Sequence, residues 1–242
     1  MTEIRDQHLI GATVERVSLR GSALTDVRLT GAELFDVEIS GELTNVVVNG
    51  VDIGPLVDAE LDRRMPERAM MRPEDTAGFQ QAWDVLEQLW AGTVERARTH
   101  PEALLHRRVG VEWSFVQTLR HLGFATAAWA GRMVLGNPDP WHPLDLPWDE
   151  APGWDGISWD RDVQPPLDEV LALRAERQAM VRGVLATMTD AQLASTVTAV
   201  GPGWPLAGAE VGVAQCLRIV LNEEWEHRLY AERDLTLLTD RG

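Results

Sequence analysis

Lysine is absent from this sequence of 242 residues: all 22 basic residues are arginines, against 38 acidic residues, so the formal net charge is −16. Binding to DNA or RNA depends mainly on contacts between cationic side chains and phosphates. We therefore expect no nucleic-acid partner for so acidic a chain. Cysteine is almost absent as well, because Cys216 stands alone, which excludes an internal disulfide and indicates a reducing compartment.

Long apolar runs are also missing. No stretch approaches the roughly 20 apolar residues of a membrane-spanning helix, and the first six residues lack the basic start and apolar core of a signal peptide. The sequence thus predicts a cytoplasmic protein with no membrane partner. Hydrophobic residues nevertheless make up 45% of the chain, enough to bury a sizeable core.

A repeat occupies the first fifty residues. Glycine recurs every ten residues from Gly11 to Gly41, and a large apolar residue recurs every five, at Leu9, Val14, Leu19, Leu24, Leu29, Leu34 and Ile39. A helix repeats its faces every 3.6 residues and a strand every two, so neither keeps a period of five on one side. A square solenoid, with one large residue turned inward on each side, does keep it.

The segment 9–53 resembles the pentapeptide repeats, whose small–x–large pattern stands here as Ala12-Thr13-Val14 and Ala32-Glu33-Leu34. The resemblance implies a short right-handed β-solenoid over residues 1–56, of little more than two coils. The alternative is a small irregular β-sheet with accidental glycine spacing. Because each repeat needs neighbours to bury its apolar face, we expect the segment to lean on the rest of the chain or on a second copy, as in a homodimer.

The remainder of the chain has a helical pattern, so the fold class is mainly α. Residues 57–74 are expected to be a linker, and amphipathic stretches of helix length follow at 75–98, 112–135, 166–187 and 211–238. Four helices with one long crossover predict a four-helix bundle over 75–242. The connection 137–165 is rich in Trp and Pro, and it is either a lid over a substrate or a cover for the core.

A metal site is predicted from side chains on two of these helices. Glu223 and His227 stand at i and i+4 and so lie about 40° apart on one helix face. His121 lies in the middle of the second helix, on its inward stripe. Two imidazoles and a carboxylate are a common catalytic zinc set, and they also suit nickel or iron. The alternative is a surface pair of His227 with Glu223 and a separate, hydrogen-bonded core His121.

Residues 75–238 resemble the DinB/YfiT-like superfamily of metal-binding four-helix bundles. The resemblance is carried by three stretches, Glu112-Trp113-Ser114-Phe115, Leu119-Arg120-His121-Leu122 and Asn222-Glu223-Glu224-Trp225-Glu226-His227-Arg228. It implies one ligand on the second helix, His121, and two ligands at i and i+4 on the fourth, Glu223 and His227. Many members have histidine where this chain has Glu223, whereas the mycothiol-dependent maleylpyruvate isomerases of the superfamily use a glutamate there.

The resemblance further implies an S-transferase or isomerase that depends on a divalent transition metal, zinc above all, and on a low-molecular-weight thiol such as mycothiol or bacillithiol. A bound cation would hold the thiol as thiolate, which is the nucleophile. The expected partners are therefore a small-molecule thiol and an electrophile. Residues that would line the pocket are Thr118, Ala125, Arg132, Trp141 and His142. The chain's own thiol, Cys216, is expected to act as a small buried apolar residue.

Two other functions remain open at this point. The chain would be a non-catalytic interaction module if the acidic repeat segment docks a partner and the metal is structural or vestigial. It would be a metal-assisted hydrolase if a bound water is the nucleophile. The hydrolase lacks an evident general base, because Glu224 and Glu226 turn away from the face that carries Glu223 and His227.

Overall fold

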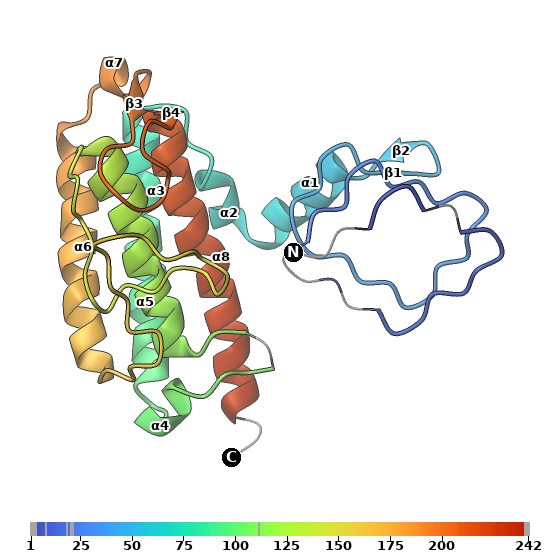
Figure 1. Ribbon diagram of the computed structural model, residues 1–242, viewed down its shortest axis with the longest axis horizontal. Helices are drawn as coiled ribbons and strands as arrows, with labels where there is room; N and C mark the ends of the chain where they lie inside the picture. The colour runs from blue at the N-terminus through green and yellow to red at the C-terminus, as the bar shows by residue number, and fades with distance from the viewer. Residues whose placement is uncertain (1–3, 8, 18, 20–21, 111, 240–242) are drawn as a thin grey trace. The chain divides into compact units, whose positions relative to one another are not determined.

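The computed structural model describes residues 4–7, 9–17, 19, 22–110 and 112–239 (Figure 1). The chain divides into two compact units, Met1–Thr44, called here the N-terminal unit, and Asn45–Gly242. All helices and strands among these residues belong to the second unit. In the described part of the chain, no helix is both long and apolar enough to cross a membrane.

The N-terminal unit keeps the period of five as a series of bends. Backbone of the left-handed type, with φ between 51° and 143°, recurs at Asp6, Gly11, Arg16, Asp26, Gly31, Asp36 and Gly41. Its described residues contain no strand. The four leucines expected to point inward are 58–67% exposed: Leu19, Leu24, Leu29 and Leu34.

The solenoid prediction is not confirmed for the N-terminal unit: its described residues keep the regular bends, but they contain no strand and no buried row of apolar side chains. In a solenoid each coil takes its backbone partners and its apolar contacts from the coil beside it. A segment of little more than two coils offers few such neighbours, so its apolar side chains stay in contact with solvent.

The stretch expected as a linker, 57–74, is largely helical. A hairpin pairs β1 (Val47–Val48) with β2 (Val51–Asp52), and α1 (Gly54–Arg64) and α2 (Pro66–Met70) follow it. A proline lies in the first turn of each helix, where its fixed φ suits the helix and its missing N–H removes no hydrogen bond. Pro66 is therefore a helix start and not a mark of irregular chain.

Four long helices make up the body of the second unit, at nearly the predicted bounds. They are α3 (Thr76–Ala97), α5 (Phe115–Thr126) continued by the π-helix η1 (Ala127–Val134), α6 (Leu167–Thr187) and α8 (Val213–Thr239). Both α3 and α5 pack against α6 and α8, so the four close into a bundle (Figure 1). The prediction of a mainly helical chain is confirmed.

Shorter elements cover the ends of the bundle. These are α4 (Glu102–Leu105), α7 (Asp190–Leu193) and an antiparallel hairpin in which Val197 of β3 (Thr196–Thr198) lies opposite Val211 of β4 (Glu210–Gly212). The connection 137–165 contains no helix or strand. It crosses α5 as an irregular chain, as Figure 1 shows, and places Trp141, Trp148 and Trp159 against Phe124 of that helix.

The core follows the axis of the bundle. Large apolar side chains meet there from α3 and α8, namely Phe79, Trp83, Leu86, Leu217, Leu221 and Trp225. A second cluster joins Trp90 of α3 to Leu119 and Leu122 of α5. All of these side chains are at most 3% exposed, so the bundle holds α5 and α8 in a fixed relation.

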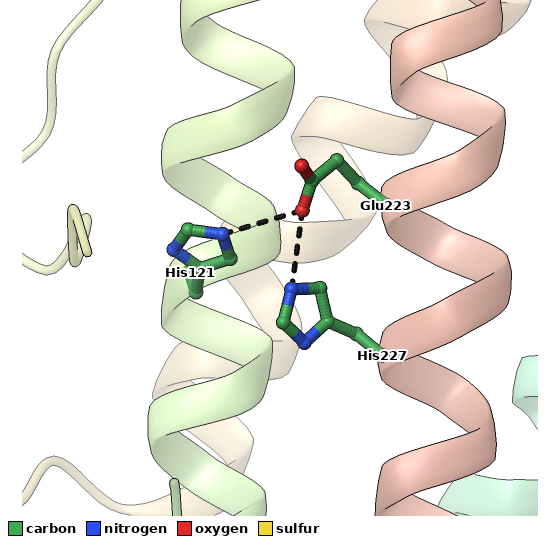
Figure 2. A group of neighbouring side chains, drawn as sticks. All are labelled: His121, Glu223 and His227. Carbon is green, nitrogen blue, oxygen red and sulfur yellow. Dashed lines mark hydrogen bonds and ion pairs between the residues drawn. The ribbon is translucent and has the colours of Figure 1, made fainter. Parts of the chain in front are cut away.

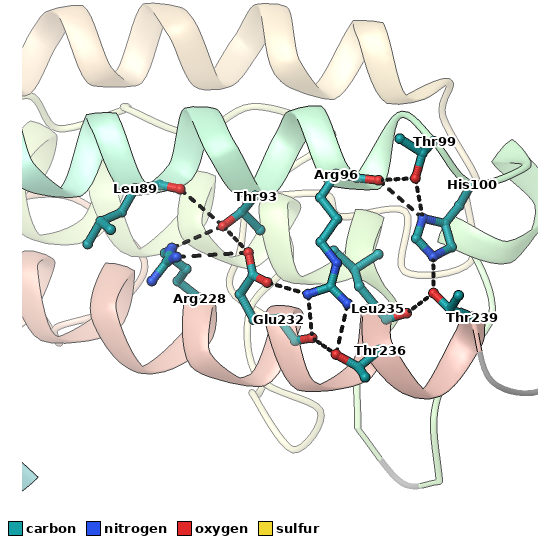
Figure 3. Close-up of polar contacts among 10 residues, drawn as sticks. All are labelled: Leu89, Thr93, Arg96, Thr99, His100, Arg228, Glu232, Leu235, Thr236 and Thr239. Carbon is teal, nitrogen blue, oxygen red and sulfur yellow. Dashed lines mark hydrogen bonds and ion pairs between the residues drawn. The ribbon is translucent and has the colours of Figure 1, made fainter. Parts of the chain in front are cut away.

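Polar contacts clasp the C-terminal halves of α3 and α8 together (Figure 3). The carboxylate of Glu232 accepts a hydrogen bond from Thr93 Oγ1 and another from Arg96 Nη1, each at 2.6 Å. Beyond them, Nε2 of His100 lies 3.0 Å from Oγ1 of Thr239. The two hydrogen bonds to the Glu232 carboxylate are stronger than neutral ones because the acceptor is charged. Together these contacts fix the half of α8 that carries His227.

Candidate metal centre

Three of the predicted site residues converge inside the bundle. His121 of α5 points toward Glu223 and His227 of α8 (Figure 2). Nε2 of His121 lies 3.3 Å from Oε2 of Glu223, and Nε2 of His227 lies 3.1 Å from the same oxygen. One ligand atom from each residue lies within 4.8 Å of the other two, and no other such group of His, Cys, Asp and Glu occurs among the described residues.

The sequence at the start of α5 fixes where this helix begins, and with it the position of His121. The helix begins with a capping box: Ser114 Oγ accepts from the amide of Gln117 at 3.2 Å, and Gln117 Oε1 accepts from the amide of Ser114 at 3.0 Å. This reciprocal pair fixes the first residue of the helix. The imidazole of His121, two turns later, is then held in the buried face of α5 with a relative exposure of 7%.

A backbone carbonyl orients the imidazole ring of His121. Its Nδ1 lies 2.9 Å from the carbonyl oxygen of Leu146, in the connection 137–165. A carbonyl only accepts, so Nδ1 carries a hydrogen and Nε2 is the ring nitrogen turned toward Glu223. Nε2 lies 3.3 Å from an oxygen of Glu223, so either a proton on Nε2 or a cation between the two atoms offsets their repulsion. A divalent metal ion can take the place of that proton, and the donor set therefore fits one.

Glu223 is ionised in this setting. Burial opposes the charge of its carboxyl group, but hydrogen bonds and positive charge from His121 and His227 outweigh burial and hold its pKa well below the usual range. The site therefore combines one full negative charge with two nitrogen donors. Such a set attracts a dication more strongly than three neutral imidazoles do.

The neighbouring carboxylate has a different environment. Glu224 points away from the cluster, as consecutive helix residues do, and forms a two-pronged ion pair with Arg174 of α6. The two side chains are 2% and 5% exposed. The Arg174 guanidinium also lies 4.6 Å from the ring centre of Trp90. Glu224 is thus part of the structural core, and it turns away from the face that carries Glu223 and His227, as expected.

An indole ring lies against both imidazoles of the cluster. The ring centre of Trp113 is 4.4 Å from that of His121 and 5.6 Å from that of His227. Nε1 of Trp113 donates to Oδ1 of Asp149, in the connection 137–165, at 2.9 Å. Trp113 belongs to one of the stretches that carry the family resemblance, but nothing in its residue type or spacing marked it as a neighbour of the cluster.

The predicted pocket residues Thr118, Ala125 and Trp141 lie close to His121 along the chain or in space. Thr118 and Ala125 are buried on α5, one turn before and one turn after it. Trp141 stacks on Phe124 with ring centres 5.6 Å apart, and the Phe124 ring centre is 6.0 Å from that of His121. An apolar aromatic surface therefore continues from the imidazole into the connection 137–165.

The other two predicted pocket residues are directed elsewhere. Arg132, on η1, donates to the carbonyl oxygens of Val200, Gly201 and Pro205 in the β3–β4 loop, and it is fully buried. His142 uses Nδ1 to accept from the amide of Leu144 at 3.1 Å. Neither joins the group around Glu223. The sequence alone does not distinguish an arginine near a helix end that binds a ligand from one that donates hydrogen bonds to a loop.

Comparison with known proteins adds one finding. A family model described as the DinB superfamily matches residues 79–231, which include all of α5 and α6 and most of α3 and α8. No curated protein and no solved structure matches the chain. The matched range contains His121, Glu223 and His227.

Proposed function

Because the chain belongs to the DinB superfamily and carries a cluster of two imidazoles and a carboxylate, we propose that it is a metal-dependent enzyme that transfers a low-molecular-weight thiol to an electrophile. The enzyme is either an S-transferase, whose product keeps the thiol, or an isomerase, in which the thiol adds to the substrate and leaves again. The observation that carries the proposal is the convergence of His121, Glu223 and His227 within 4.8 Å. Zinc is the expected metal, with nickel or iron as alternatives.

Each side chain has a distinct task in this proposal. When bound, a divalent cation with three protein ligands supplies an open position and lowers the pKa of a thiol that it coordinates. Leu146 keeps the hydrogen of His121 on Nδ1, which leaves Nε2 free to ligate. Glu223 lowers the net charge of the site, and the rings of Trp113 and Phe124 exclude water from its sides.

The aromatic surface beside His121 supports an apolar or aromatic electrophile. Trp141 and Trp159, both in the connection 137–165, contact the ring of Phe124, with ring centres 5.6 Å from it. Offset and edge-on stacking on such rings favours flat apolar groups. In the proposal this surface holds the electrophile while the ligated thiol approaches from the cluster.

The first test is metal content. The chain is purified without a histidine tag, and its metals are measured by elemental analysis beside the His227→Ala variant. We expect one transition-metal ion per chain in the wild type and almost none in the variant. Protein that is folded but metal-free, even after incubation with zinc, nickel or iron, would contradict the proposal.

The second test is turnover. Consumption of mycothiol, bacillithiol and glutathione is followed with a bimane or chlorodinitrobenzene electrophile, with and without metal. We expect turnover with at least one thiol, loss of activity in His227→Ala and near wild-type activity in Cys216→Ala, because the nucleophile comes from the cosubstrate. Stoichiometric metal without turnover of any thiol would favour a structural metal in an interaction module instead.

A further inference from the structure

Trp113 occupies a position where a helix start ordinarily receives a different contact. It stands immediately before the N-cap Ser114, where an apolar side chain commonly packs on the fourth residue of the helix. That fourth residue is Thr118, small and polar, and it lines a cavity of about 10 Å³ together with Trp113. The indole instead lies against the imidazole of His121, one turn further along α5.

The indole also reaches the second helix of the site. Its plane is inclined by 23° to that of His227, so the two rings are stacked, and by 39° to that of His121. One rigid ring therefore lies against both imidazoles, which come from helices far apart in the sequence. A ring in this position limits the rotamers of both imidazoles and covers the side of the cluster on which it lies.

A single hydrogen bond from the connection 137–165 holds the indole in place. Nε1 of Trp113 donates to Oδ1 of Asp149 at 2.9 Å, and Oδ2 of Asp149 accepts from Nη2 of Arg108 at 3.2 Å. The side chains of Arg108 and Asp149 are 43% and 51% exposed. Exposed charge pairs are worth little because water and salt screen them. The ring is thus held by a contact that opens easily, whereas the side chains of His121 and His227 beneath it are only 9% and 18% exposed.

We propose that Trp113 is a positioning residue and a cover for the metal centre, closed by its hydrogen bond to Asp149. The inference rests on the proposed function, because it requires the His–Glu–His cluster to bind a metal ion. It adds that the connection 137–165 controls the cluster at two points, since Leu146 sets the tautomer of His121 and Asp149 holds the indole over both rings.

The experiment measures release of Co²⁺ to a chelator by stopped flow, together with quenching of tryptophan fluorescence by the bound ion. Trp113→Phe removes the N–H and keeps a ring, while Asp149→Ala removes the acceptor, so both break one hydrogen bond. We expect each to release Co²⁺ about tenfold faster than the wild type, within the 10- to 100-fold range of residues that support metal ligands. The double variant should be no faster than either single one, because the same bond is lost.

Matched variants separate this role from a general effect on folding. Asp149→Asn keeps an oxygen acceptor and should restore release to near the wild-type rate. Trp154→Phe changes a tryptophan of the same connection whose ring neighbours are Trp148 and Trp159. It should keep both the release rate and most of the quenching, whereas Trp113→Phe should lose the largest single share of the quenching.

The outcomes distinguish the two levels of the argument. A wild type that binds no Co²⁺ or Zn²⁺ would overturn the proposed function and this inference with it. A wild type that binds metal, with Trp113→Phe and Asp149→Ala releasing it at the wild-type rate and with unchanged quenching, would overturn the cover alone. Additive effects in the double variant would show that Trp113 and Asp149 act separately, which also contradicts the inference.

Discussion

Replacing Arg174 by Leu should destabilise the protein strongly, because it leaves the carboxylate of Glu224 buried without a counter-ion. The pair is bidentate, with Nη1–Oε1 at 3.0 Å and Nη2–Oε2 at 2.5 Å, and both side chains are at most 5% exposed. Removal of one partner from a buried pair costs about 3–5 kcal/mol. For a chain of this size, a loss of 1 kcal/mol lowers Tm by about 2–4 °C, so Tm should fall by roughly 6–20 °C.

Urea unfolding and calorimetry of the metal-free protein provide the measurement. Arg98→Leu is the matched control: Arg98 pairs with Asp168 of α6, the two side chains are 45% and 78% exposed, and the change should stay within about 1 kcal/mol of the wild type. The double variant Arg174→Met with Glu224→Leu should recover most of the loss, because an apolar pair of similar volume needs no charge compensation. An Arg174→Leu variant within about 1 kcal/mol of the wild type would refute the reasoning.

Three other predictions follow from buried polar groups. Burial raises the pKa of the Asp145 carboxyl from 3.8 to about 6, so the stability that this group contributes is present at low pH and is lost as the pH rises through about 6. Asp145→Asn should therefore gain up to about 3 kcal/mol relative to the wild type between pH 4 and pH 7, measured by urea titrations at several pH values; a flat difference would contradict this. Burial raises the pKa of the Cys216 thiol to about 11, so Ellman's reagent should react with the native protein far more slowly than with the denatured one, and equal rates would refute the buried position. Arg132→Leu should cost about 3 kcal/mol or more by leaving three carbonyls of the loop 200–205 without their donor, while the exposed Arg182→Leu should cost less than about 1 kcal/mol in the same urea assay.

The four long helices and the face that carries Glu223 and His227 could be predicted from the sequence, because both follow from local periodicity. A stripe at i, i+3 and i+4 placed the four long helices to within three residues of their observed ends. The same geometry put Glu223 and His227 on one face of α8. Only the meeting with His121 required more than one helix, and it rested on the inward stripe of α5 and on the family resemblance.

The contacts that complete the site were not accessible in this way. The carbonyl of Leu146 carries no residue-type signal, and its approach to His121 depends on the path of a connection without helix or strand. The π-helix η1 was predicted as plain α-helix, since over two turns both windings present nearly the same apolar stripe. The burial of the leucines in the N-terminal unit was predicted wrongly for a related reason. The period of five is present as bends, but burial of these leucines needs neighbouring coils that so short a segment does not supply.

Two adjacent glutamates of α8, Glu223 and Glu224, have different partners, and the contacts of Glu224 determine the orientation of Glu223. Glu224 is tied to Arg174, and its backbone carbonyl accepts from Nε1 of Trp90 at 3.2 Å. Together these contacts fix the rotation of α8 at one residue. Because successive residues are about 100° apart, the same rotation sets the direction of Glu223 toward His121. The Arg174→Met and Glu224→Leu double variant should thus regain stability and yet bind Co²⁺ more weakly than the wild type, since its apolar contacts leave the rotation of α8 less defined. Wild-type affinity in that variant, measured by competition with a chelator, would mean that core packing alone aims the helix.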